Sequence, residues 1–199
     1  MVRIPLSVLI LVFVSSLLLL PNFGFSADEM KGHGMIGKET TIVGGQAMYP
    51  NKDIIDNAVN SADHTTLVSA VKAAGLVETL KGPGPFTVFA PVNSAFDALP
   101  KGAVENLLKP ENKDALVKVL TYHVVPGKLT ASGLIKLIRA SGGKANLKTV
   151  SGGTLVAMMN GPRNIVIVDE KGDIANIMTY DVIQSNGVIH LIDRVLLPK

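Results

Sequence analysis

The 199-residue chain contains no cysteine and no tryptophan, and aromatic residues make up only 5% of it. Without cysteine the protein has neither disulfide bonds nor a lipid-modified cysteine, so its stability must come from a hydrophobic core. The length is enough for one domain with a sizeable core, or for such a domain with a tail. The Asn-X-Ser/Thr sequon is also absent, which removes one reason to expect an N-glycosylated surface protein.

Acidic residues are missing from a long interval in the middle of the chain. None occurs between Asp114 and Asp169, although the formal net charge of the whole chain is only +3. The basic residues in this interval are Lys118, Lys128, Lys136, Arg139, Lys144, Lys148 and Arg163. They form either a solvated surface with counter-charges elsewhere or one anion-binding face, and the sequence leaves both interpretations open. The small net charge gives no indication of nucleic-acid binding.

The sequence also lacks the motifs of the common catalytic sites. Its histidines, His33, His64, His123 and His190, are far apart, and none has the partner four residues away that a helical zinc site uses. A Gly-X-Ser-X-Gly elbow, a glycine-rich phosphate loop and a complete calcium loop are missing as well. We therefore predict a protein that is not an enzyme and holds no cofactor.

The first 50 residues indicate an export signal followed by a linker. Residues 1–27 carry Arg3, an apolar block over 6–20 and small residues at their end, the pattern of a secretory signal peptide. The block is shorter than the ~20 residues of a spanning helix, so we expect cleavage, no stable membrane span afterwards, and a secreted or periplasmic protein. Residues 28–50 are rich in glycine and predict a flexible linker. The soft ligands scattered there, Met30, His33, Met35 and Met48, are weak evidence of a copper site.

From residue 51 onward, helical periodicity comes first and alternating periodicity second. Short amphipathic helices are predicted over 54–80, and further ones over 93–121 follow a strand at 86–91. Residues 122–127 predict a short strand and turn, and 132–140 a helix. Strands are then expected at 146–150, 154–159, 164–168, 174–177, 180–183 and 188–196. This order indicates one α+β domain over residues 51–199.

The last strand, over residues 188–196, organises this domain. It follows an Asn186-Gly187 turn, its alternate positions are apolar on both faces, and Pro198 closes it. A strand covered on both faces is central in its sheet. A histidine within such a strand, here His190, is most often buried and hydrogen-bonded, and we expect it to be structural.

Three segments in order resemble the signatures of fasciclin domains. Residues 87–96 are similar to the first signature segment, Tyr122-His123 to the central tyrosine-histidine pair, and residues 186–198 to the second segment. The signature positions are Thr87, Phe89, Ala90, Pro91, Asn93, Phe96, Asn186, Gly187, His190 and Asp193. The resemblance implies an α+β fold with a wedge or sandwich of roughly seven strands. Several short helices pack on it, and the two signature strands lie side by side at its centre.

The resemblance also implies a function. Fasciclin domains are mostly secreted or surface-attached adhesion modules, and this chain resembles the short single-domain bacterial type. The family's pattern makes Tyr122 and His123 the expected partner-binding residues. We therefore predict an exported, non-enzymatic module that makes cell-surface or matrix contacts through a protein or glycan partner. The alternative is a periplasmic carrier or sensor of a small apolar ligand, held between the helices and the strands. The oligomeric state stays open.

Overall fold

The structure is a computed structural model that describes residues 40–199. The predicted signal peptide and residues 28–39 of the predicted linker lie outside the described residues, as do Met30, His33 and Met35. Within residues 40–199, no helix has both the length and the apolar character needed to cross a bilayer.

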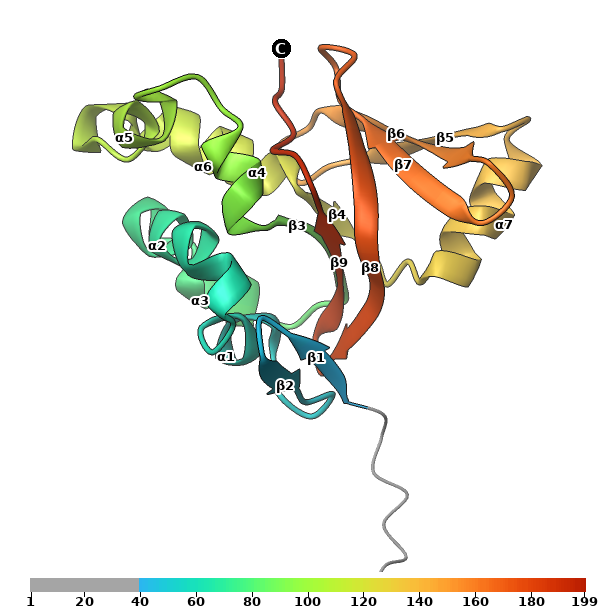
Figure 1. Cartoon of the computed structure of the whole chain (residues 1–199), viewed down its shortest axis with the longest axis horizontal. Helices are drawn as coiled ribbons and strands as arrows, with labels where there is room; N and C mark the ends of the chain where they lie inside the picture. The colour runs from blue at the N-terminus through green and yellow to red at the C-terminus, as the bar shows by residue number, and fades with distance from the viewer. Residues whose placement is uncertain (1–39) are drawn as a thin grey trace, which may run out of the picture. The chain divides into compact units, whose positions relative to one another are not determined.

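A seven-stranded sheet forms the centre of the domain (Figure 1). Its strands lie in the order β4-β3-β9-β8-β7-β6-β5 and all neighbours are antiparallel except β3 and β9, which are parallel. Their bounds are β3 (Phe86–Pro91), β4 (Val124–Pro126), β5 (Lys144–Lys148), β6 (Thr154–Asn160), β7 (Asn164–Val168), β8 (Ile174–Gln184) and β9 (Gly187–Ile192). A backbone hydrogen bond from Val150 N to Val124 O links the chain after β5 to β4, so the two edges of the sheet approach each other. The α+β fold with about seven strands is confirmed.

The two signature segments supply the parallel pair at the centre of the sheet. Phe89 lies opposite His190, and all six residues of β9 are buried. Gly187 begins β9 where the backbone of β3 passes closely, and a Cβ atom there would lie 2.2 Å from the carbonyl oxygen of Phe86. Only glycine fits this approach. The predicted central strand and its predicted neighbour are both confirmed.

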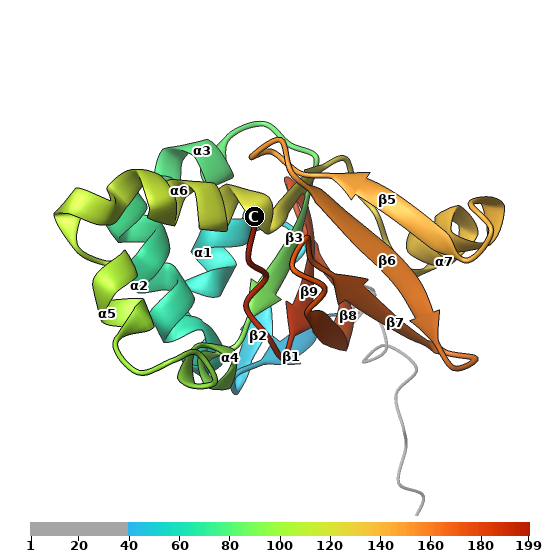
Figure 2. The same cartoon turned by 90° about the horizontal axis from the view of Figure 1, so that it is seen from above.

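Seven α-helices surround the sheet within the described residues. They are α1 (Ile54–Ala58), α2 (Thr65–Ala74), α3 (Val77–Lys81), α4 (Asn93–Asp97), α5 (Ala103–Leu107), α6 (Lys113–Tyr122) and α7 (Ala131–Ala140). Local signals set their ends: the Asp53 carboxylate caps α1, the Thr130 hydroxyl caps α7, and Gly75 ends α2 with a φ of 73°. Helices α1 to α6 lie on one side of β3 and β9, whereas α7 lies beside β5 and β6 (Figures 1 and 2).

The strand pair β3 and β9 separates two hydrophobic cores. Val88, Ala90, Ile189 and Leu191 face the helices and belong to the first core. The alternate residues of both strands, including Phe89 and Ile192, face the other way and pack with β5 to β8 and with Leu134 and Ile138 of α7. Because successive strand residues point to opposite faces, one apolar segment serves both cores.

The structure corrects the predicted linker over residues 40–50. This part forms a hairpin of β1 (Thr41–Val43) and β2 (Gln46–Met48), turned by Gly44-Gly45. Val43 and Met48 are buried in the first core, so the folded domain begins before residue 51 and Met48 is not free to bind copper. A glycine pair between two three-residue strands has no periodicity to reveal it, and the composition suggested flexibility instead.

Several further boundaries differ from the predicted ones. β5 covers Lys144–Lys148 and not 146–150, and β9 ends at Ile192 and not at 196. The strands expected at 174–177 and 180–183 are one strand, β8, with irregular register between Ile177 and Val182 and a positive φ of 56° at Asp181. Tyr122 and His123 are not in a strand, because Tyr122 is the last residue of α6 and His123 is its C-cap.

Candidate functional site

The structure places Tyr122 and His123 inside the domain. Helix α6 turns Leu116 and Leu120 toward the first core, whereas Tyr122 at its end packs in the core that contains α7. Tyr122 is 0% exposed and His123 is 3% exposed. This burial corrects the expectation that the pair contacts a partner directly, because neither side chain reaches the surface.

The hydroxyl of Tyr122 connects two turns of the sheet. It donates a hydrogen bond to Thr154 O at 2.9 Å and accepts one from Glu170 N at 2.9 Å. Burial raises the pKa of Tyr122 to about 12, so the phenol stays neutral. Gly153 lies against the ring, and a Cβ atom on it would come within 2.6 Å of Tyr122 Cε2. Tyr122 therefore has a structural role.

His123 connects α6 to the C-terminal segment. Its Nδ1 donates to Val119 O at 2.8 Å and its Nε2 accepts from Leu196 N at 2.9 Å, an assignment that follows from the two partners. Burial lowers the pKa of His123 to about 4. The ring is neutral at neutral pH and both of its nitrogens are occupied, so it has no free group for a ligand.

The first signature segment holds neighbouring loops in place. The Thr87 hydroxyl donates to Gly127 O at 2.7 Å and accepts from Leu129 N at 2.8 Å. The Asn93 amide accepts from Thr66 N at 3.1 Å and donates to Ala62 O at 2.8 Å, which ties the start of α4 to the start of α2. The rest of this segment packs in the cores: Phe89 and Ala90 are buried and Phe96 is partly buried. Pro91 ends β3 beside Ile192.

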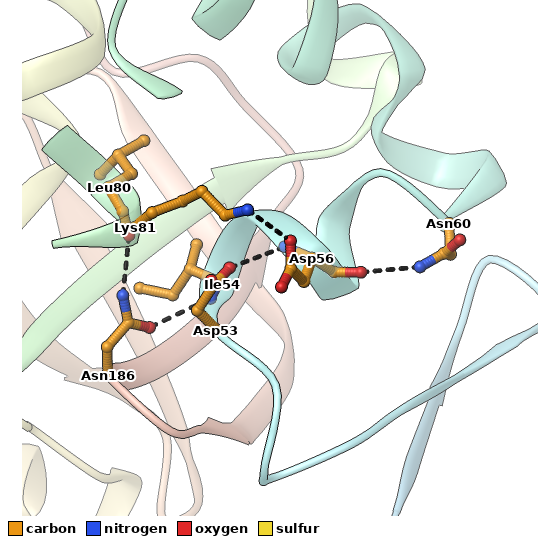
Figure 3. A network of polar contacts seen from close by, with 7 residues as sticks. All are labelled: Asp53, Ile54, Asp56, Asn60, Leu80, Lys81 and Asn186. Carbon is orange, nitrogen blue, oxygen red and sulfur yellow. Dashed lines mark hydrogen bonds and ion pairs between the residues drawn. The ribbon is translucent and has the colours of Figure 1, made fainter. Parts of the chain in front are cut away.

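Asn186 of the second segment fastens two helices to the sheet (Figure 3). Its side-chain oxygen accepts from Ile54 N at 3.0 Å, and its amide donates to Leu80 O at 2.7 Å and to Gly82 O at 3.2 Å. One residue of the β8–β9 turn thus fixes both the start of α1 and the end of α3. An ion pair of 2.8 Å between Asp56 and Lys81 joins the same two helices.

His190 and Asp193 complete the second segment. His190 is fully buried, its Nε2 donates to Leu129 O at 2.8 Å, and its Nδ1 accepts from Asp181 N at 3.3 Å. Burial lowers the pKa of His190, as expected for a structural histidine. Asp193 accepts from the backbone and side-chain nitrogens of Asn176, both at 2.7 Å.

An exposed apolar surface lies elsewhere, on the sheet. Residues directly opposite in an antiparallel pair share a face. The register puts Val156, Val168 and Ile174 in one row, and Met158 in the next row beside Lys144. Ile174 is 52% exposed and Met178 51%. We call this surface the outer sheet face, defined by Val156, Met158, Val168, Ile174 and Met178; α7 covers the opposite face of the same strands.

Basic and amide groups border the outer sheet face. Lys144, Asn146 and Lys148 of the edge strand β5 are exposed and alternate with Ala145 and Leu147, which are buried on the opposite face. The acid-free interval does not form a single surface, because Lys136 and Arg139 belong to α7 on the other side of the sheet and Lys118 to α6. Only part of the basic stretch therefore lies beside the outer sheet face.

The sequence analysis did not identify this face. The sequence did contain a sign of it, because Val156 and Met158 of β6 alternate with the buried residues Leu155 and Ala157. Such a strand is apolar at both parities, a pattern equally expected of a strand covered on both sides. Among residues 40–199, no three histidine, aspartate or glutamate side chains gather in a group able to hold a metal ion.

Comparison with known proteins places the chain in a family. The model of the family described as Fasciclin domain matches residues 62–198. Protein sll1483 of Synechocystis sp. is 44% identical over 163 residues, which are 81% of this chain and 82% of that protein. Cell surface glycolipoprotein MPB83 of Mycobacterium bovis is 34% identical over 161 residues, covering 78% of this chain and 64% of the relative.

The fold has a counterpart among solved structures. A FAS1 domain pair from the insect cell adhesion molecule fasciclin I matches with a TM-score of 0.66 and 20% identity, over 73% of this chain and 51% of the pair. The shared fold, the matched family model and the similarity to sll1483 agree with one another. The chain belongs to the fasciclin domain family.

Proposed function

We propose that the protein is an exported, non-enzymatic binding module that makes cell-surface contacts by docking an acidic partner protein on the outer sheet face. The observation that carries the proposal is the exposure of Ile174 and Met178 on β8, on the face whose far border, beyond β7 and β6, carries Lys144 and Lys148 of β5. Exposed apolar patches with polar borders mark interaction surfaces. Similarity to a cell surface glycolipoprotein supports the location.

The chemistry of the face favours a protein over a glycan. Its centre consists of aliphatic and methionine side chains, which bury well against apolar side chains of a partner. Lys144 and Lys148 at the border attract an acidic surface and steer its approach. A glycan would use the basic border but leave the apolar centre without a matching group.

A non-enzymatic role agrees with the state of the conspicuous polar residues. Tyr122, His123 and His190 use their polar atoms in hydrogen bonds within the domain. A catalytic acid or base needs reach to a substrate. These residues stabilise the fold, and the working surface is the outer sheet face.

The docking proposal is tested by reversing charge on one side of the sheet. In the full chain, Lys144→Glu with Lys148→Glu changes the border of the outer sheet face, and Lys136→Glu with Arg139→Glu makes the same change in net charge on α7. Host cells are allowed to bind the immobilised proteins. We expect the first variant to lose at least tenfold in retention, the α7 variant to match wild type, and retention to fall with added salt.

Two results would overturn this assignment. Equal retention of both variants places the contact elsewhere. Retention that survives protease treatment of the cells but not glycosidase treatment makes the partner a glycan. Export is tested separately by mass spectrometry of the protein from its host. A mature N-terminus near Asp28 is expected, whereas a membrane-bound chain that begins at Met1 contradicts cleavage.

A further inference from the structure

A cavity of about 250 Å³ lies between the helices and the sheet. Its walls come from α1, α2 and α3 on one side and from β3 and β9 on the other. The lining is almost wholly aliphatic, with Ile54, Val71, Leu80, Val88 and Ile189 among its side chains. Engineered apolar cavities of ~150 Å³ bind benzene. This space therefore holds a larger apolar molecule, and it lies on different elements from the outer sheet face.

One buried polar atom in the cavity wall has no partner. His64 lines the cavity and is 4% exposed, and its Nε2 has no hydrogen-bond partner among residues 40–199. The backbone of Ala90 acts on the ring and raises its pKa, but this contact does not meet both the distance and the angle of a hydrogen bond to Nε2. A buried donor without a partner is unfavourable, so such a group in an apolar wall points to a ligand.

The neighbours of His64 determine whether its Nε2 is a hydrogen-bond donor or acceptor. Ser61 Oγ lies 2.9 Å from His64 Nδ1 and accepts a hydrogen bond from Asp63 N at 3.3 Å. The serine hydroxyl can accept from Asp63 N and donate to Nδ1 at the same time, and with its proton assigned in this way the remaining ring proton is on Nε2. Burial lowers the pKa of His64 against the opposing effect of Asp63, so the ring is neutral and Nε2 is an uncharged donor.

The other buried polar side chains in this wall, Ser61 and His123, are already occupied, Ser61 by His64 and Asp63. His123 also lines the cavity, but both of its nitrogens bond within the domain. A ligand therefore meets one donor in an apolar enclosure. That combination suits a molecule with one acceptor, since a second polar group would be buried without a partner.

The geometry points to a binding site in this cavity for a small apolar molecule that carries one neutral acceptor, such as a ketone or ester carbonyl, bonded to the Nε2 proton of His64. Specificity comes from the single donor, and affinity from the aliphatic walls. The site is independent of a partner docked on the outer sheet face.

Hydrogen bonds hold the helices in the wall of the cavity, whereas an exposed ion pair spans its entrance. Asn186 fixes α1 and α3 through partly buried hydrogen bonds from its side chain to the backbone of both helices (Figure 3). The exposed lining residues include Asp56, Val59 and Lys81, so the cavity reaches the surface between these helices. The Asp56–Lys81 ion pair spans this entrance, and exposed pairs of this kind contribute little to stability. A ligand therefore enters without disrupting the core.

A pair of probes of equal shape tests the site. The full chain is titrated with 2-acetylnaphthalene, which has one carbonyl acceptor, and with 2-isopropenylnaphthalene, in which a CH2 group replaces the carbonyl oxygen and no acceptor remains. We expect the ketone to bind about tenfold more tightly than the hydrocarbon, the gain from satisfying one buried donor. In His64→Leu this preference should vanish while the hydrocarbon still binds. In Val71→Phe, which fills the cavity, binding of both should be lost, and Lys144→Glu with Lys148→Glu should bind both as wild type does.

A measurement on the unaltered protein covers the case in which His64→Leu does not fold. The infrared carbonyl stretch of bound 2-acetylnaphthalene should lie below its value in hexane, because a hydrogen bond weakens the carbonyl bond. A stretch at the hexane value, or equal affinity for the two probes in wild type, overturns the role of His64. If neither probe binds, the cavity is not a ligand site.

Discussion

Single residues carry much of the cohesion of this domain, and Tyr122 is the best example. Its hydroxyl bonds Thr154 O and Glu170 N, which belong to different turns of the sheet. Tyr122→Phe removes the partner of a partly buried N–H, so we expect a loss of about 1 to 3 kcal/mol in the free energy of unfolding. Urea denaturation of the full chain measures this. Tyr49→Phe, at a 44% exposed site, is the control and should change stability little. Equal stability of the two variants would contradict the role of the hydroxyl.

The buried histidines predict how stability depends on pH. Burial holds the pKa of His123 at about 4, whereas an unfolded histidine titrates near 6.5. Between these values the unfolded state binds the additional proton. The contribution of the neutral His123 ring to the free energy of unfolding is therefore fully present above pH ~6.5 and is lost as the pH falls toward 4. It amounts to about 3 kcal/mol. Burial shifts the pKa of His64 and of His190 in the same direction.

Histidine ring signals in NMR spectra recorded from pH 7.5 to 4.5 measure this shift. The His123 signal of the folded protein should not titrate above pH 5, while in urea it should titrate near 6.5. A folded-state midpoint near 6.5 would mean that the ring is accessible to solvent. Denaturation midpoints over the same range should fall with pH.

Residue types alone gave only part of the information at this scale. A histidine among apolar strand residues indicated the buried, bonded state of His190. Tyr122 and His123 were expected to contact a partner because the fasciclin resemblance implies that role, and their residue types did not show that both side chains are buried. His64 stands in a short polar stretch, and only the three-dimensional arrangement shows that its Nε2 has no partner. Sequence periodicity gives no information on hydrogen bonds between segments that are far apart in the chain.

At the scale of elements, the strands with strong periodicity were predictable and the shortest ones were not. The bounds of β7 agree with the prediction, and β9 was expected as the central strand. The hairpin β1–β2 was missed, because two three-residue strands give too few positions for an alternating pattern. The outer sheet face was missed for a related reason. An apolar residue in a strand does not show whether another part of the protein covers it.

The hairpin supplies a prediction at this scale. Met48 is 3% exposed in the first core, whereas Ile42 on the same hairpin is 63% exposed. If the hairpin is part of the domain, Met48→Ala should lower the free energy of unfolding by about 2 to 5 kcal/mol. Ile42→Ala should stay within about 0.5 kcal/mol of wild type. Urea denaturation of the two variants decides between a packed hairpin and a tether, because a tether makes both changes neutral.

At the scale of the whole domain, the two cores are built on the same pair of strands. Phe89 faces the core with α7, and its neighbours Val88 and Ala90 face the core with the helices. A residue of β3 or β9 cannot leave one core without pulling its neighbours from the other. Two cores joined in this way should unfold together, unlike cores joined by a linker.

Tyrosine fluorescence and circular dichroism can report on the unfolding of the two cores separately, because the chain has no tryptophan and three tyrosines. In a Tyr49→Phe background, the fluorescence comes from Tyr122 and Tyr180, both packed in the core that contains α7. The helical signal comes mostly from α1 to α6, on the other side of β3 and β9. We expect the two urea transitions to coincide. Leu134→Ala, which opens a space only in the core of α7, should move both midpoints down together. A fluorescence midpoint that falls while the helical midpoint stays would show that the shared strands do not couple the two cores.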